Sequence, residues 1–228
     1  SHSLSLRLSY LFYRIPSGKA IEQEKKFEKP RRFAYNEENG CAAAMAEEQM
    51  MELECRPVNR KNARKVRKIY LDSFEKDDRM PYFLMRMMAK LWHTKLLSFY
   101  DGETLCGFLY LAVSKKLVFV MFFAVEESLR GKGYGSRILE RLSALYPQKK
   151  IIVTIEKCER GAPDLEERQR RKKFYLNNGY RETGYLIKMG KEQEVLVKNG
   201  TFLKQEFFRF FLRYSNLTVM PKIWKPAP

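Results

Sequence analysis

The sequence has few cysteines, few histidines and no long apolar run, and each scarcity argues against a class of protein. Its 228 residues include four cysteines and two histidines, without any Cys-x-x-Cys pair. This argues against a disulfide framework and against a zinc site, so we expect reduced thiols, a cytoplasmic protein and no bound metal. No stretch approaches the roughly 18 consecutive apolar residues of a membrane-spanning helix, and we expect no membrane partner.

Acidic residues are scarce relative to basic ones. Lys and Arg number 44 against 27 Asp and Glu, which gives a net charge of +17. Residues 1–50 carry eight Lys or Arg against seven Glu, so +16 of this charge falls on residues 51–228. Such a surface attracts nucleic acid, acidic protein or a phosphorylated cofactor, and a merely solvated basic surface is an equally open interpretation. Because the sequence lacks a helix-turn-helix or RNA-binding signature, we do not expect nucleic acid as the main partner.

The chain divides near residue 50. Residues 1–50 show no sustained helical or strand period, and we expect an untypical extension or an added leader there. Met50 or Met51 is a plausible natural start. Residues 51–228 have the regular patterns of one domain, and the chain's 45% apolar and 14% aromatic content is enough for a sizeable core.

Hydrophobic periodicity predicts the elements of this domain. Asn59 is expected to cap the first helix, Asp164 with Glu167 forms a predicted capping box for the fourth, and Asn178-Gly179 should end that helix. The order predicts a mixed α/β (α+β) domain with one dominant, mostly antiparallel sheet flanked by helices. The expected strands are 53–58, 95–100, 104–113, 117–125, 151–155, 185–189 and 194–198, and the expected helices are 59–74, 81–92, 134–146, 164–178 and 202–214.

A basic glycine-rich loop, Arg130 to Gly135, follows an apolar strand and precedes a helix. A helix amino terminus exposes unpaired N–H groups and the positive end of its dipole, so it attracts anions. Glycines at 131, 133 and 135 would let the backbone approach a phosphate and adopt positive φ, while Arg130 and Lys132 add charge. This combination predicts a pyrophosphate cradle, and glycines placed for packing alone are the open alternative.

Two other phosphate-binding motifs do not fit this loop. A P-loop needs Gly-Lys-Ser/Thr, and Gly135-Ser136 lacks the intervening lysine. A dinucleotide-binding fold needs Gly-x-Gly-x-x-Gly in an early βαβ unit, whereas these glycines have another spacing and follow three antiparallel-type strands.

Two motifs together carry a resemblance to a known family. Arg130-x-x-Gly133-x-Gly135 matches the Gln/Arg-x-x-Gly-x-Gly/Ala signature of the GNAT superfamily of N-acetyltransferases. Downstream, Phe174-Tyr175 followed by Gly179-Tyr180 resembles the second hallmark of that family. The element order from Leu53 to about Val219 is also similar, so the resemblance covers about three quarters of the chain.

The resemblance implies a GNAT-like fold and transfer of an acetyl group from acetyl-CoA to a primary amine. The amine would attack the thioester directly in a ternary complex, and the acceptor would be a small-molecule or protein amine. Another acyl-CoA donor, a homodimer, and a non-catalytic or nucleic-acid-binding regulatory module on the same scaffold stay open.

The resemblance also assigns roles to residues. Tyr175 would protonate the departing thiolate, and Glu156, weakly preferred over Glu126 and Glu127, would take the amine proton. Arg168 departs from the family, which often has Asn there, and the basic run 168–173 could bind the cofactor's 3′-phosphate or an acidic substrate. The end of the strand before the loop would pair with the pantetheine arm, and the loop would hold the pyrophosphate. The expected cofactor-binding residues are therefore Phe123, Ala124, Val125, Arg130, Gly131, Lys132, Gly133, Tyr134, Gly135 and Ser136.

Overall fold

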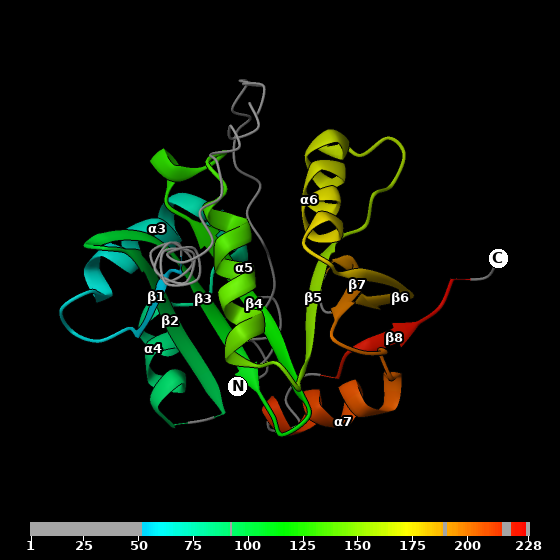
Figure 1. The fold of residues 1–228 in the computed structure, drawn as a ribbon. Helices are drawn as coiled ribbons and strands as arrows, with labels where there is room; N and C mark the ends of the chain where they lie inside the picture. Colours follow the sequence, from blue (N-terminus) through cyan, green and yellow to red (C-terminus); the bar gives the residue numbers. More distant parts are fainter. Residues whose placement is uncertain (1–51, 92, 189–190, 216–219, 227–228) are drawn as a thin grey trace, which may run out of the picture.

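The computed structural model of the chain describes residues 52–91, 93–188, 191–215 and 220–226 (Figure 1). The predicted extension over residues 1–50 lies outside the described residues, and so do Trp92 and Met189, at which two elements were predicted to end. Within the described part, no helix is long and apolar enough to cross a membrane.

One eight-stranded sheet organises the molecule, in the order β1-β2-β3-β4-β5-β7-β6-β8. Neighbouring strands are antiparallel except for β4 and β5, which run parallel. The predicted mixed, mostly antiparallel sheet is therefore confirmed. The strands are β1 Glu54–Pro57, β2 Thr94–Asp101, β3 Thr104–Val113, β4 Leu117–Val125, β5 Lys150–Glu156, β6 Arg181–Lys188, β7 Glu192–Lys198 and β8 Lys222–Trp224.

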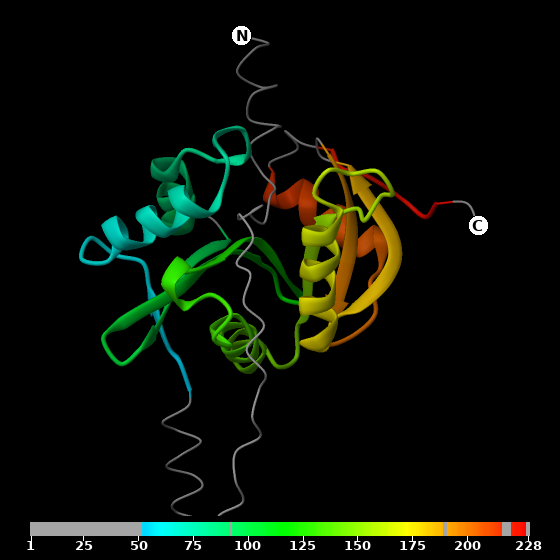
Figure 2. The same cartoon turned by 90° about the horizontal axis from the view of Figure 1, so that it is seen from above.

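Helices cover both faces of the sheet (Figures 1 and 2). One core cluster joins the sheet to α3, α4 and α7, and a second joins the opposite face to α5 and α6. Because β3 and β4 are buried on both faces, they read as nearly continuous apolar runs in the sequence. The helices are α3 Ala63–Ser73, α4 Tyr82–Leu91, α5 Tyr134–Leu145, α6 Leu165–Asn177 and α7 Lys204–Tyr214, with short 3-10 turns η1 Lys76–Asp78 and η2 Glu127–Leu129.

The first helix begins later than predicted. Asn59 heads a turn, in which its side-chain oxygen accepts the backbone N–H of Lys61 at 2.8 Å. Its carbonyl accepts the N–H of Ala63 at 3.0 Å, and α3 starts there. Asn59 therefore does not cap α3, because its side chain is used by the preceding turn.

The helix α6 begins and ends where the sequence predicted, but without a capping box. No side-chain cap bond forms at Asp164, because its carboxylate accepts from Arg168 at 2.8 Å. Glu167 likewise pairs with Arg171 at 2.9 Å. Charged partners one turn along the helix thus take the carboxylates that were expected to cap it. The predicted stop is confirmed, since Gly179 has a φ of +79°.

The two parallel strands separate partway along their length. The pairing of β4 with β5 runs from Leu117 opposite Lys150 to Val120 opposite Val153. Beyond it, β4 continues on β3 alone and β5 on β7 alone. The carboxyl ends of β4 and β5 therefore diverge, and the loops that follow them both start at this open end.

Candidate active site

The open end leaves backbone groups of β4 without a strand partner. The N–H of Glu126 donates to the carbonyl of Cys106 on β3 at 2.8 Å. Hydrogen-bonded pairs alternate along an antiparallel ladder, and the register between β3 and β4 is unbroken over this stretch. Ala124 is therefore also bonded to β3, whereas Phe123 and Val125 direct their N–H and C=O groups toward the gap. An extended ligand could add there as a strand.

Arg130 braces this edge from inside the protein. Its Nε donates to the carbonyl of Val125 at 3.2 Å, and its Nη2 donates to Ser73 Oγ at 2.8 Å. Ser73 lies in the last turn of α3 and is buried. The guanidinium therefore ties the loop to β4 and to α3, and it occupies a carbonyl that an added strand would otherwise use. No local sequence signal could reveal this contact, because its partners are 57 residues apart.

The three loop glycines serve two purposes. Gly131 and Gly133 have φ of +75° and +83°, as predicted. For Gly135 the predicted positive φ is wrong, because this residue lies within α5. A Cβ on Gly135 would lie 3.1 Å from the ring of Phe174, so this glycine allows α5 to approach α6. The two sequence motifs thus meet in space at this contact.

The amino terminus of α5 is open to an anion. Gly133 caps the helix without a side-chain hydrogen bond, and its first turn has no acidic residue. The N–H of Ser136 already donates to the Gly133 carbonyl at 3.1 Å, so the amides before it are the better candidates for a phosphate. Lys132 is exposed beside them.

Tyr134 and Arg137 fix the start of α5 to the turn between β2 and β3. The hydroxyl of Tyr134 and Nη1 of Arg137 both donate to Asp101 Oδ2, at 2.9 and 2.8 Å. These hydrogen bonds, from Arg137 first and Tyr134 second, hold the pKa of Asp101 below its ordinary value. The side chain of Tyr134 therefore has a structural partner, which leaves its backbone for a ligand.

Tyr175 is buried on α6, packed against Phe174 and Tyr180. Its hydroxyl has no hydrogen-bond partner among the described residues. Burial raises the pKa of Tyr175 well above its ordinary value, and the Arg171 guanidinium one turn earlier acts in the opposite direction. The phenol is therefore protonated at neutral pH and available as a donor.

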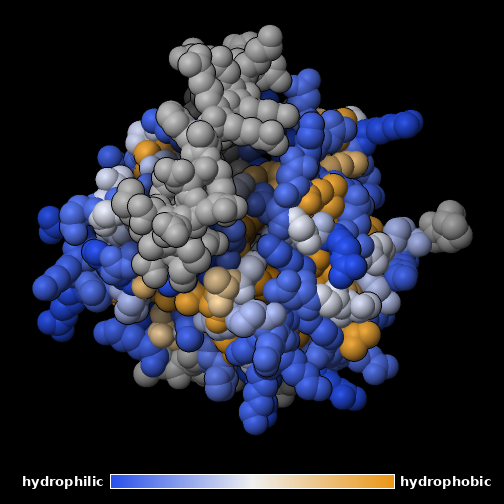
Figure 3. All heavy atoms as spheres, in the orientation of Figure 1, coloured by the Kyte–Doolittle hydropathy of each residue, from blue (hydrophilic) through white to orange (hydrophobic). Residues whose placement is uncertain are grey.

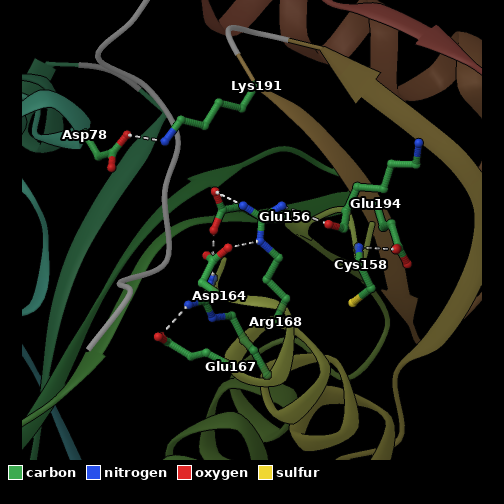
Figure 4. A network of polar contacts seen from close by, with 10 residues as sticks. Asp78, Glu156, Cys158, Asp164, Glu167, Arg168, Lys191 and Glu194 are labelled. Atoms are coloured by element: carbon green, nitrogen blue, oxygen red, sulfur yellow. Dashed lines mark hydrogen bonds and ion pairs between the residues drawn. The ribbon is translucent and has the colours of Figure 1, made fainter. Parts of the chain in front are cut away.

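Glu156 ends β5 and is 2% exposed. Its carboxylate oxygens lie 3.6 Å from Arg168 Nη2 and 3.5 Å from Arg171 Nη1 (Figure 4). Arg168 also donates to Asp164 and to the carbonyl of Lys157. Arg168 and Arg171 of the basic run thus turn toward the protein, and they connect the end of β5 to α6.

Glu126 has a local role in the structure. Its carboxylate accepts the N–H of Ser128 at 2.8 Å and also the hydroxyl of Ser128. This arrangement caps the 3-10 turn that contains Glu127 and leads into the glycine loop.

The fold and the site define an α/β protein with a glycine-rich loop and a helix amino terminus at the open end of two parallel strands. Residues 93–182 match the family model described as an acetyltransferase (GNAT) domain. This match confirms the resemblance to the GNAT superfamily, whose acetyltransferases use acetyl-CoA as co-substrate.

Solved structures share the fold at low sequence identity. A putative GNAT-family acetyltransferase from Bacteroides thetaiotaomicron is 19% identical with a TM-score of 0.56, and the match covers 72% of this chain and 96% of that one. A variant of the spermidine N-acetyltransferase SpeG from Vibrio cholerae is 12% identical with a TM-score of 0.50, covering 68% and 98%. No curated protein sequence matches the chain significantly.

Proposed function

We propose that this chain transfers an acetyl group from acetyl-CoA to a primary amine. The observation that carries the proposal is the open end of β4 and β5, where unpaired backbone groups and a helix amino terminus lie together. The pantetheine arm would bond Phe123 and the N–H of Val125 as an added strand. The pyrophosphate would lie on the loop amides from Gly131 to Gly135. This places the thioester between the diverging strands, close to α6.

The chemical step we propose is direct displacement at the thioester. The neutral amine attacks the acetyl carbonyl, the C–S bond breaks, and its electron pair goes to sulfur. Tyr175 then gives its proton to the thiolate. Burial raises the pKa of Tyr175 above the ordinary phenol value near 10, and the same burial would raise the pKa of a thiol held beside it above its ordinary value near 8.5, so the two stay close enough for this transfer. The buried, unpartnered hydroxyl of Tyr175 supports this role, because a ligand sulfur would give it a partner.

For removal of the amine proton we propose Glu156, directly or through a water molecule. A carboxylate offers about four lone-pair sites, and Arg168 and Arg171 occupy those that face them. The remaining sites would serve the amine. Glu156→Gln should lower kcat and keep the affinity for CoA. An unchanged kcat would exclude Glu156 from the chemical step and leave it only a positioning role between β5 and α6.

The charge of the domain restricts the acceptor. Because residues 51–228 carry +16, they repel polycations such as polyamines. The likeness to a spermidine N-acetyltransferase lies at 12% identity and reflects the fold alone. We therefore propose an amine of low positive charge, either a small molecule or a protein amine, as the acceptor.

The test has two stages. Isothermal titration should show CoA binding with a micromolar dissociation constant, and absence of binding at tens of micromolar would contradict the proposal. A panel of amines, each with acetyl-CoA and with succinyl-CoA, should then show consumption of acetyl-CoA. Consumption of succinyl-CoA instead would show that the acyl donor is succinyl-CoA. CoA binding without turnover on any amine would favour a regulatory module.

A further inference from the structure

A continuous cationic surface covers the outer side of α3 and the turn before it. We call it the basic face; its four helical members fall on an arc of about 160° at 3.6 residues per turn. The opposite side of the helix packs into the core through Val66, Ile69 and Tyr70. All members of the basic face are exposed: Arg60, Lys61, Arg64, Lys65, Arg67 and Lys68.

Among the residues that the structure describes, no carboxylate forms an ion pair with a member of the basic face, because every pair there involves another cation. By contrast, three cations of the basic run of α6, Arg168, Arg171 and Lys172, each pair with a glutamate or aspartate, and of the cations of that run only Arg170 and Lys173 are exposed. The sequence makes both helices basic, and only the structure shows that the charge on α3 is available to a partner.

The cations lie where the physics of a helix disfavours them. Arg64 and Lys65 occupy the first turn of α3, which contains no acidic residue and carries the positive end of the helix dipole. Arg64 and Lys68 are four residues apart, and Arg67 and Lys68 each follow a first-turn cation by three, so like charges meet along one side. A local conflict without a compensating contact is typical of a functional surface.

The spacing of these charges indicates the chemistry of the partner. Six cations lie within nine residues, or about 12 Å of helix axis, which is one charge per roughly 2 Å. Duplex DNA presents one negative charge per about 1.7 Å of helix axis when both strands are counted, and one per about 3.4 Å along a single strand. An extended acidic peptide reaches at most one charge per about 3.3 Å in a single line. Because the basic face spreads over an arc of about 160°, it is wide enough to contact both strands of a duplex, and its charge density then matches a duplex better than an extended acidic peptide.

We propose that the basic face docks a nucleic-acid duplex through its phosphates, without reading the bases. In Figure 2, α3 lies at the rim of the molecule, away from α6 and α7, and the same flank is hydrophilic in Figure 3. The end of α3 that meets the glycine loop is Ser73, whereas Arg64 lies about 14 Å along the axis toward the other end.

The test is fluorescence anisotropy of a labelled duplex DNA of about 20 base pairs and mixed sequence, titrated between roughly 50 and 200 mM salt, a range in which phosphate contacts weaken strongly. One variant combines Arg64→Glu, Lys65→Glu and Lys68→Glu. The matched control combines Lys115→Glu, Lys188→Glu and Lys204→Glu, which changes the net charge equally at other exposed lysines. Each lost phosphate contact reduces the steepness of log affinity against log salt concentration by about 0.9. The first variant should therefore show a slope that is shallower by roughly 3 and an affinity that is at least about tenfold lower.

The control variant should keep the wild-type slope. Equal losses of duplex affinity in both variants would show that net charge alone causes the loss and would overturn the proposal. So would the absence of duplex binding at the lowest salt, or displacement of the duplex by polyglutamate at equal charge concentration. CoA titration and thermal melting of both variants establish that they are folded, so this outcome is independent of the proposed acetyl transfer.

Discussion

Arg130 should stabilise the glycine loop through protein contacts, whereas Lys132 should contact the phosphate directly. Replacing Arg130 with Met keeps an apolar stem and removes the donors to Val125 and Ser73. Each hydrogen bond from a charged donor contributes about 1.5–3 kcal/mol. Because the loop can relax and admit water, we expect Arg130→Met to lower the free energy of unfolding by about 2–4 kcal/mol.

That loss corresponds to a melting temperature lowered by roughly 5–15 °C for a domain of this size. CoA affinity should also fall, by about tenfold, because the loop amides are displaced. The fall should not depend on salt, since no charge contact with the ligand is removed. Lys132→Met is the matched control: Lys132 is exposed, so its loss should leave the melting temperature unchanged and reduce the salt dependence of CoA binding.

A double-mutant cycle sharpens the test. Ser73→Ala removes one acceptor of the Arg130 guanidinium, and the pair should couple by about 1.5 kcal/mol or more in thermal or denaturant unfolding. Additive effects of Ser73→Ala and Arg130→Met would show that the contact carries no energy. If Arg130→Met melted like the wild type and instead reduced the salt dependence of CoA binding, Arg130 would be a phosphate ligand and this reasoning would be refuted.

The remaining predictions concern the contact between the two motifs and the buried tyrosines. The side chain introduced by Gly135→Val should clash with Phe174, which should lower the free energy of unfolding by about 1–3 kcal/mol and weaken CoA binding. A variant that is as stable as the wild type and binds CoA equally well would contradict this close packing. Tyr175→Phe should raise the melting temperature of the ligand-free protein, because an unpartnered buried hydroxyl is removed, while acetyl transfer falls and CoA affinity is kept; unchanged turnover would exclude Tyr175 from the mechanism. Burial raises the pKa of Tyr70, Tyr175 and Tyr180 above that of the unfolded chain. The folded state therefore holds more protons on these tyrosines than the unfolded state above about pH 10, so their contribution to stability should be constant below that pH, and stability should fall above it in circular dichroism melts.

Much of the fold could be predicted because the information is local. The strands β3 and β4 were predicted with their observed bounds, since turn residues and long β-branched and aromatic runs delimit them. The stop at Gly179 followed from glycine's access to positive φ. Helix starts were less predictable. The side chains of Asn59 and Asp164 were predicted to accept hydrogen bonds from helix amides, but Asn59 accepts from the N–H of Lys61 in the preceding turn and Asp164 accepts from the side chain of Arg168.

The sequence by itself determined the glycine loop and the helix that follows it, because positive-φ glycines and a helix start are encoded within a few residues of each other. Tertiary structure decided how far β4 and β5 pair, which backbone groups face the gap, and that Arg130 reaches Ser73 across 57 residues. It also decided that Arg168, Arg171 and Lys172 of α6 pair with carboxylates, whereas no ion pair among the described residues involves the basic face of α3. These contacts depend on the packing of distant segments, and composition and periodicity carry no record of which segments meet.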